Sequence, residues 1–154
     1  MIYTSYWANP LPADYVRIGI SRGSPRWIKG SPPRIPALAP EQWLYTVQDF
    51  EDFRSRYSQQ LSCLDADEIS DEIDRLAGGR IPVLCCFCKP STSGTAYCHR
   101  SLASAFLEYR LGLIVEEYGV PGGHGVFHPF LPDSRRRPVE TATAPIQPVQ
   151  LDLL

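Results

Sequence analysis

Residues 81–87, Ile-Pro-Val-Leu-Cys-Cys-Phe, and residues 98–109, which begin Cys-His-Arg-Ser-Leu, decide the fold of this chain. The first stretch is short and continuously apolar, a pattern typical of a central strand covered on both faces. The second stretch carries apolar residues at helical spacing, so it predicts a helix with one buried face. A buried strand that leads into such a helix indicates an α/β domain.

The flanking sequence predicts the other elements of the domain. Proline is absent between residues 41 and 81, and because proline breaks helices, the long helices are expected there. Further strands are expected at residues 1–7, 15–21 and 113–118, and further helices at 41–61 and 65–77. About eight residues separate the first two strands, which is short for a helical crossover. Either a loop makes this crossover or the two strands are antiparallel.

Together these elements predict a small three-layer, Rossmann-like α/β domain over residues 1–118, with a mostly parallel sheet. After Gly119 the sequence changes character and ends in a low-complexity, proline-rich stretch. Residues 119–154 are therefore expected to form an irregular C-terminal extension.

The composition excludes several classes of protein. Hydrophobic residues make up 44% and charged residues 21% of the 154 residues, as in globular domains rather than disordered chains. The formal net charge of −2 argues against a general nucleic-acid clamp. No apolar run reaches the ~18 residues of a membrane span, and no signal-peptide pattern is present, so a cytoplasmic protein without a membrane partner is expected. The five cysteines are then expected to be reduced thiols.

The triplet Cys98-His99-Arg100 is the sharpest candidate for a functional site. It opens a helix that follows a buried strand, and the first turn of a helix attracts anions through its unpaired N–H groups and its dipole. Arg100 adds a fork of donors for a phosphate or carboxylate. In an alternative interpretation Cys98 caps the helix, His99 packs under the preceding loop and Arg100 pairs with a surface acid.

The cysteines suggest two further kinds of chemistry. A thiol at a helix N-terminus beside a cation is a better nucleophile, so Cys98 is a candidate catalytic residue, with His99 as an acid or base. A zinc-like pattern is also present, a Cys-x-x-Cys pair followed nine residues later by Cys-His, among residues Cys85, Cys86, Cys88, Cys98 and His99. Zinc ribbons place the close pair on a turn, however, whereas Cys85 and Cys88 bracket the end of an apolar strand, where neighbours alternate faces. Neither a metal ion nor another cofactor is expected.

Several stretches of the chain resemble the family catalogued as domain of unknown function 488. They are MIYTSYWAN at 1–9, VRIGIS at 16–21, GSPRWIKG at 23–30, AGGRIPVLCCF at 77–87 and YCHRSLASAFL at 97–107. The Trp-Ile-Lys-Gly motif is similar to the short, phage-type branch of the family. The resemblance implies a Rossmann-like fold and a shared site, without an established reaction. Many members carry an acidic residue after the third strand, where this chain has Cys86-Phe87-Cys88.

These observations predict a phosphorylated or nucleoside-like small molecule as the ligand, bound beyond the carboxyl ends of the strands. Hydrolysis or transfer at a glycosidic or phosphate bond is the expected reaction class, if the protein is an enzyme. The expected ligand-binding residues are Ser5, Tyr6, Asn9, Arg22, Trp27 and Arg100. The alternatives are a non-catalytic protein that sequesters a nucleotide and a factor that binds DNA or protein through arginine-rich segments. The sequence does not predict an oligomeric state.

Overall fold

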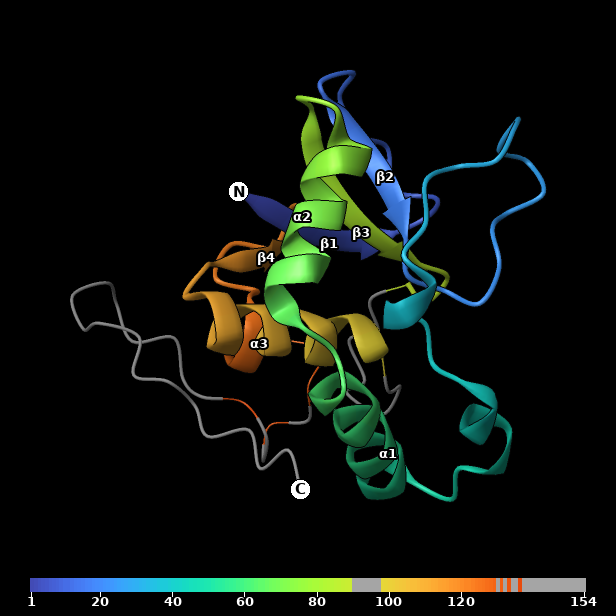
Figure 1. Ribbon diagram of the computed structural model, residues 1–154, viewed down its shortest axis with the longest axis vertical. Coiled ribbons are helices and arrows are strands. Elements are labelled where there is room, and N and C mark those ends of the chain that lie inside the picture. Colours follow the sequence, from blue (N-terminus) through green and yellow to red (C-terminus); the bar gives the residue numbers. More distant parts are fainter. Residues whose placement is uncertain (90–97, 130, 132, 134–135, 137–154) are drawn as a thin grey trace.

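The structure is a computed structural model that describes residues 1–89, 98–129, 131, 133 and 136 (Figure 1). The described residues form the strands β1 (Ile2–Tyr6), β2 (Tyr15–Gly19), β3 (Ile81–Cys86) and β4 (Val115–Glu117). They also form the α-helices α1 (Phe50–Ser62), α2 (Ala66–Ala77) and α3 (His99–Leu111). Short 3₁₀ turns in the same residues are η1 (Pro36–Leu38), η2 (Gln42–Thr46) and η3 (Gly125–Phe127). The four expected strands are thus confirmed.

The strands form one sheet in the order β2-β3-β1-β4, and every neighbouring pair is parallel. The expected α/β class with a parallel sheet is therefore confirmed. Strand β3 lies between β1 and β2, so those two strands are not neighbours and a loop makes the crossover between them. Because all four strands are parallel, all their carboxyl ends lie at one edge of the sheet.

Capping side chains explain where α1 and α2 begin, whereas the N-cap Cys98 of α3 makes no side-chain capping hydrogen bond. Helix α2 begins as expected, since the side chain of Asp65 accepts hydrogen bonds from the backbone N–H groups of Asp67 and Glu68. The single helix expected over residues 41–61 is instead divided into η2 and α1. Asp49 has an extended backbone and its side chain accepts from Asp52 N at 2.8 Å, so it caps a helix in the middle of that segment.

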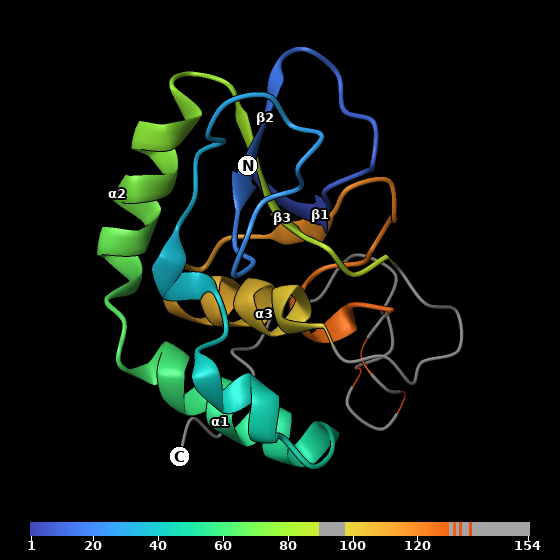
Figure 2. The same ribbon diagram turned by 90° about the vertical axis from the view of Figure 1, so that its right-hand side faces the viewer.

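The helices pack on one side of the sheet (Figure 2). Helices α2 and α3 cover the sheet directly, and α1 packs against α3 farther from the strands. The core between these layers includes Ile18, Leu84 and Phe106, each 0% exposed. A smaller apolar cluster around Trp7 and Val83 covers the opposite face with loop residues. The domain thus consists of the sheet, a layer formed by α2 and α3, and the outer helix α1. The sheet does not lie between two layers of helices.

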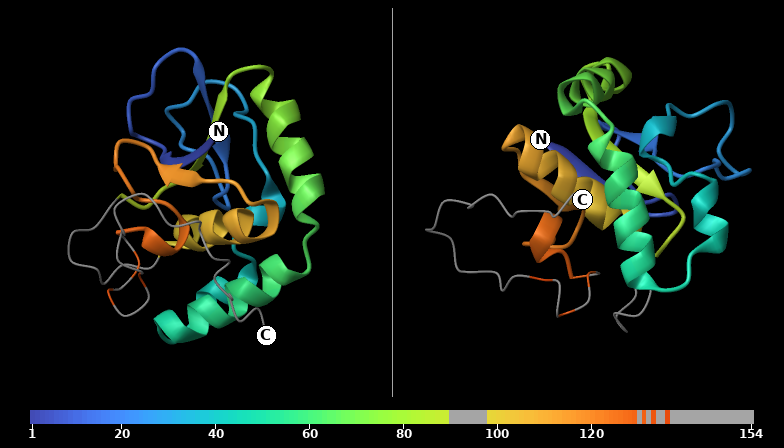
Figure 3. Two further views of the ribbon diagram at one scale, coloured as in Figure 1. Left: turned by 90° about the vertical axis from the view of Figure 1, so that its left-hand side faces the viewer. Right: turned by 60° about the horizontal axis from the view of Figure 1, so that its bottom comes forward.

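The described residues after Gly119 continue the packing of the domain (Figure 3). Turn η3 lies beside α3, and Gly125 N donates to Ser104 Oγ at 3.0 Å. Val126 is buried and Leu131 belongs to the main core. The domain boundary expected at residue 118 stays a prediction. In the part of the chain that the structure describes, no helix is both long and apolar enough to span a membrane.

Candidate functional site

The chain segments that follow β1, β2 and β3 meet at the carboxyl edge of the sheet. Trp7 N donates to Cys86 O at 2.9 Å, so the backbone of β1 continues alongside the end of β3. Ile20 N donates to Cys85 O, also at 2.9 Å. Trp7 Nε1 then donates to Ser21 Oγ at 2.9 Å, which joins the segments after β1 and β2. The segments that follow these three strands are therefore joined to one another by hydrogen bonds at this edge.

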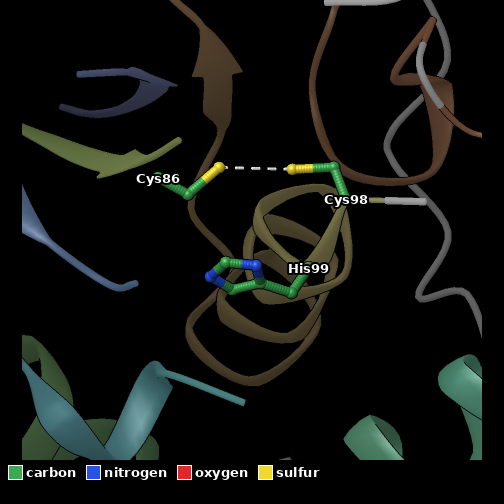
Figure 4. Close-up of side chains that lie close together, drawn as sticks. All are labelled: Cys86, Cys98 and His99. Atoms are coloured by element: carbon green, nitrogen blue, oxygen red, sulfur yellow. Dashed lines mark hydrogen bonds between the residues drawn. The ribbon is translucent and has the colours of Figure 1, made fainter. Parts of the chain in front are cut away.

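Two thiols and an imidazole gather at this edge (Figure 4). Cys86 is the last residue of β3, Cys98 is the N-cap of α3 and His99 is the first residue of α3. We call these three residues the thiol–imidazole cluster. The two sulfur atoms point toward each other at 3.4 Å, and one ligating atom from each of the three residues lies within 4.8 Å of the others. All three side chains are buried.

The contacts of His99 determine the tautomer and the orientation of its ring. Nε2 lies 2.7 Å from Ile20 O, and because a carbonyl oxygen only accepts, Nε2 carries the proton. Burial lowers the pKa of His99, so the ring is neutral at neutral pH. The lone pair of the ring is consequently on Nδ1. The edge of Tyr57 packs against the ring with centroids 5.7 Å apart, which further fixes its orientation.

Arg100 lies beneath the cluster and is 0% exposed. Its Nε donates to Glu117 Oε2 at 3.0 Å and to Oε1 at 3.2 Å. Its NH1 group donates to the sulfur atoms of Cys86 at 2.9 Å and Cys98 at 3.1 Å, and to Cys88 O at 2.5 Å. A guanidinium is always charged, so it favours negative charge on these sulfur atoms. Arg100 therefore pairs with an acid, as in the alternative interpretation of the sequence, but that acid is the buried Glu117 rather than a surface residue.

Glu117 connects Arg100 to two other elements. Thr4 Oγ1 on β1 donates to Glu117 Oε2 at 2.7 Å. His128 Nε2 lies 3.3 Å from the same oxygen, and Ser101 Oγ lies 3.3 Å from His128 Nδ1. A buried carboxylate needs several such partners to offset its lost hydration. The site is therefore held by a polar network that runs from the sheet through α3 to the residues after η3.

The cysteines of this region have different environments. Hydrogen bonds from the thiols of Cys86 and Cys98, together with the charge of Arg100, lower the pKa of Cys88 to about 3. The pKa of Cys98 is raised well above its ordinary value by hydrogen bonds to Cys86 and Cys88 and by burial. Cys88 is exposed, whereas the other two are buried. Cys85 lies on the opposite face of the sheet, and burial raises its pKa to about 12.

The expected ligand-binding residues on β1 lie at the same edge but on different faces. Tyr6 pairs in register with Cys86, so its half-buried side chain lies on the face that carries the cluster. Ser5 pairs with Cys85 on the opposite face, where Asn9 Nδ2 donates to Ser5 Oγ at 3.0 Å. Tyr6 is thus the β1 residue nearest in register to the cluster.

The arginine-rich loop after β2 has a fixed base and an exposed tip. Arg34 NH2 donates to the carbonyl oxygens of Ser21 at 2.7 Å and Arg22 at 2.8 Å. Arg22 NH1 donates to Pro40 O at 3.1 Å, and its guanidinium lies 5.2 Å from the ring centroid of Tyr45. Trp27 is 60% exposed at the tip. Arg22 and Arg100, both expected to bind the ligand, have separate partners here.

Sequence reasoning did not identify all residues of the site. It missed Thr4, Glu117 and His128, which have no local pattern that distinguishes them from ordinary strand and loop residues. Cys86 and Cys88, by contrast, belong to the zinc-like pattern of the sequence at the end of an apolar strand. The hydroxyl-rich loop at 91–95 and most of the arginine run at 135–137 lie outside the described residues.

Comparison with known proteins identifies the family of the chain. A family model, DUF488-N3a, described as the active DUF488-N3 subclade, matches residues 2–111. No curated protein and no solved structure gives a significant match. Since the family model covers most of the chain, the chain belongs to the DUF488-N3a family, and the resemblance drawn from its motifs is confirmed.

Proposed function

We propose that this member of the DUF488-N3a family binds a phosphorylated or nucleoside-like small molecule at the carboxyl edge of its sheet. The observation that carries the proposal is the tip of the loop after β2, where Trp27 is exposed between exposed Arg26 and Lys29. An indole face stacks on a nucleobase, and neighbouring cations attract a phosphate. A large exposed aromatic side chain with two flanking cations is a suitable surface for such a ligand.

The loop is held in place before any ligand arrives. Arg34 fastens its base to two carbonyl oxygens, and Trp7 Nε1 donates to Ser21 Oγ at its start. Gly19 N also donates to Pro33 O at 2.8 Å, which joins the start and the end of the loop. A loop ordered in advance loses less conformational entropy on binding, so it supports higher affinity.

The expected site residues then divide into a rim and a floor. Tyr6, Asn9, Arg22 and Trp27 are partly or fully exposed and can contact a ligand directly. Cys98, His99 and Arg100 are buried beneath the edge on the face that the helices cover, and Ser5 is buried on the opposite face. Hydrolysis or transfer at a glycosidic or phosphate bond would require a substrate to reach the buried Cys98 and His99. Binding without turnover therefore fits the burial of these groups better.

Calorimetric titration of the full chain with adenosine monophosphate, adenosine, ribose 5-phosphate and inorganic phosphate tests the proposal. We expect the mononucleotide to bind, and Trp27→Ala to weaken it by at least about fivefold, because stacking on an aromatic side chain contributes about 1–3 kcal/mol per base. Arg80→Ala is the matched control, since Arg80 is exposed at the amino end of β3, away from this edge. Unchanged affinity in Trp27→Ala, or binding of none of these compounds, would contradict the proposal.

The exposed cations of the same loop favour a macromolecular ligand as a second candidate. Arg22, Arg26 and Lys29 are all exposed, and several cations on one loop can contact successive phosphates of a nucleic acid. A titration with a short oligothymidylate at two salt concentrations distinguishes the candidates. Binding that falls steeply with salt, without mononucleotide binding, would support the nucleic-acid candidate and overturn the small-molecule proposal.

A further inference from the structure

We propose that Cys86, Cys98 and His99 form a zinc site, with Cys88 as the fourth ligand. This inference does not depend on the small-molecule ligand proposed above. The sulfur atoms of Cys86 and Cys98 are 3.4 Å apart, and a ring nitrogen of His99 lies within 4.8 Å of both. Tetrahedral zinc with Zn–S bonds of about 2.3 Å separates two sulfur ligands by about 3.8 Å. The three groups therefore need only small shifts to surround a metal ion.

The orientation of His99 is that of a metal ligand. A zinc-bound histidine coordinates through one nitrogen and donates its other N–H to a carboxylate, a carbonyl or water. His99 Nε2 makes such a hydrogen bond to Ile20 O at 2.7 Å. Nδ1 therefore carries a lone pair, and the ring lies next to the two sulfur atoms (Figure 4).

Arg100 supplies the charge that a thiolate-rich zinc site requires. Zinc with three thiolates and a neutral imidazole carries one net negative charge, which is costly to bury alone. The NH1 group of Arg100 donates to the sulfur atoms of Cys86 and Cys98. Such hydrogen bonds to ligating sulfur atoms stabilise the deprotonated form that binds zinc. Glu117 orients Arg100 from the other side at 3.0 Å, so the arginine is fixed in this role.

Cys88 is placed to complete the coordination. It lies two positions after Cys86, just beyond the end of β3. Arg100 NH1 donates to Cys88 O at 2.5 Å as well as to the sulfur atoms of Cys86 and Cys98, so Cys88 lies beside the cluster. Cys85, the first residue of the Cys-x-x-Cys pair in the sequence, lies on the opposite face of the sheet with Trp7 and Val83. The thiols that the fold brings together are those of Cys86 and Cys98, whose sulfur atoms are 3.4 Å apart.

Elemental analysis of the full chain, purified without chelators from zinc-supplemented cells, tests the site. We expect one zinc ion per chain, and replacement by cobalt should give the intense near-ultraviolet absorption of cobalt–thiolate bonds. Cys98→Ser and Cys88→Ser should lower the metal affinity at least about tenfold in a competition with a chromogenic chelator, an effect of the size seen when metal-site groups are altered. Cys63→Ser is the matched control, because Cys63 is an exposed thiol at the end of α1.

Two results would overturn the zinc site. One is wild-type protein that binds neither zinc nor cobalt while its thiols titrate as reduced. The other is Cys88→Ser and Cys98→Ser protein that keeps wild-type metal affinity. Because Cys88 is exposed, its serine variant is expected to fold even where Cys98→Ser does not, and circular dichroism of each variant separates loss of metal from loss of fold.

Discussion

Replacement of Glu117 by glutamine tests the buried network beneath the candidate site. The side chains of Arg100 and Glu117 are 0% and 1% exposed, and the shortest contact between them is 3.0 Å. Glutamine keeps the size of the side chain and an oxygen that can accept from Thr4 Oγ1. The change therefore removes the negative charge and leaves the guanidinium buried without its carboxylate.

The expected loss of stability follows from this geometry. Breaking a buried ion pair by removing one partner costs about 3–5 kcal/mol. Arg100 also donates to two sulfur atoms and to Cys88 O, and these contacts remain in the variant. We therefore expect a decrease in the free energy of unfolding near the lower limit, about 3 kcal/mol.

Urea denaturation followed by tryptophan fluorescence measures this loss, since Trp7 is only 2% exposed and reports on the carboxyl edge. With a slope of about 2 kcal/mol per M, the midpoint should fall by about 1.5 M. Glu116→Gln is the matched control, because Glu116 is a half-buried neighbour on β4, and its midpoint should change little.

The double variant Arg100→Met with Glu117→Leu separates an unpaired charge from a general loss of packing. Replacing both charges by apolar side chains of similar size is often neutral or stabilising, so we expect it to recover most of the stability. If Glu117→Gln lowers the free energy of unfolding by less than about 1 kcal/mol, the reasoning is refuted, because removal of the carboxylate from a fully buried ion pair should cost more.

Three other predictions concern α3 and the segment after β4. Burial raises the pKa of Glu108 to about 7, so the folded state favours the protonated acid. The protonated side chain therefore adds up to about 3 kcal/mol to the free energy of unfolding. This stabilisation is complete below pH ~4.5 and is lost as the pH rises through 7. The urea midpoint of the wild-type protein should therefore fall between pH 5 and 8, and it should fall less in Glu108→Gln. An equal fall in both proteins would show that other groups cause the pH dependence. Gly125→Ala should cost about 1–3 kcal/mol in the same assay, because the backbone φ is +40° and the new methyl group meets the Glu108 carboxylate. Gly119 also has a positive φ, of +81°, but open space around it, so Gly119→Ala should cost less and measures the backbone effect alone. Truncation after Gly119 should sharply reduce stability, since it removes buried Val126 and Leu131, each contributing about 1.5–3 kcal/mol; a soluble fragment that unfolds cooperatively would instead support the domain boundary expected from the sequence.

The elements with strong local signals were predictable from the sequence. Strand β3 is a continuous apolar run, and α2 has a capping aspartate at its start and Gly78, with a positive φ of 57°, just after its end. These features depend on side-chain spacing and backbone preferences within about a dozen residues, so they can be recognised without knowledge of the fold. The helix expected over 41–61 was only partly correct, because apolar spacing alone does not show that Asp49 caps a new helix in its middle.

The sequence by itself therefore determined the α/β class, most elements and the position of Cys98-His99-Arg100 at the start of α3. Tertiary structure alone decided the order of the strands and the partners of those three residues. His99 bonds to Ile20, 79 positions away, and Arg100 pairs with Glu117 across α3 and β4. The pairing of β4 with β1 places Glu117 opposite Thr4. The strand that lies next to β1 therefore determines whether Arg100 meets a buried carboxylate or solvent. The periodicity of the sequence carries no information on the order of the strands. That order is set when the whole core assembles, because buried polar groups then need hydrogen-bond partners from distant segments.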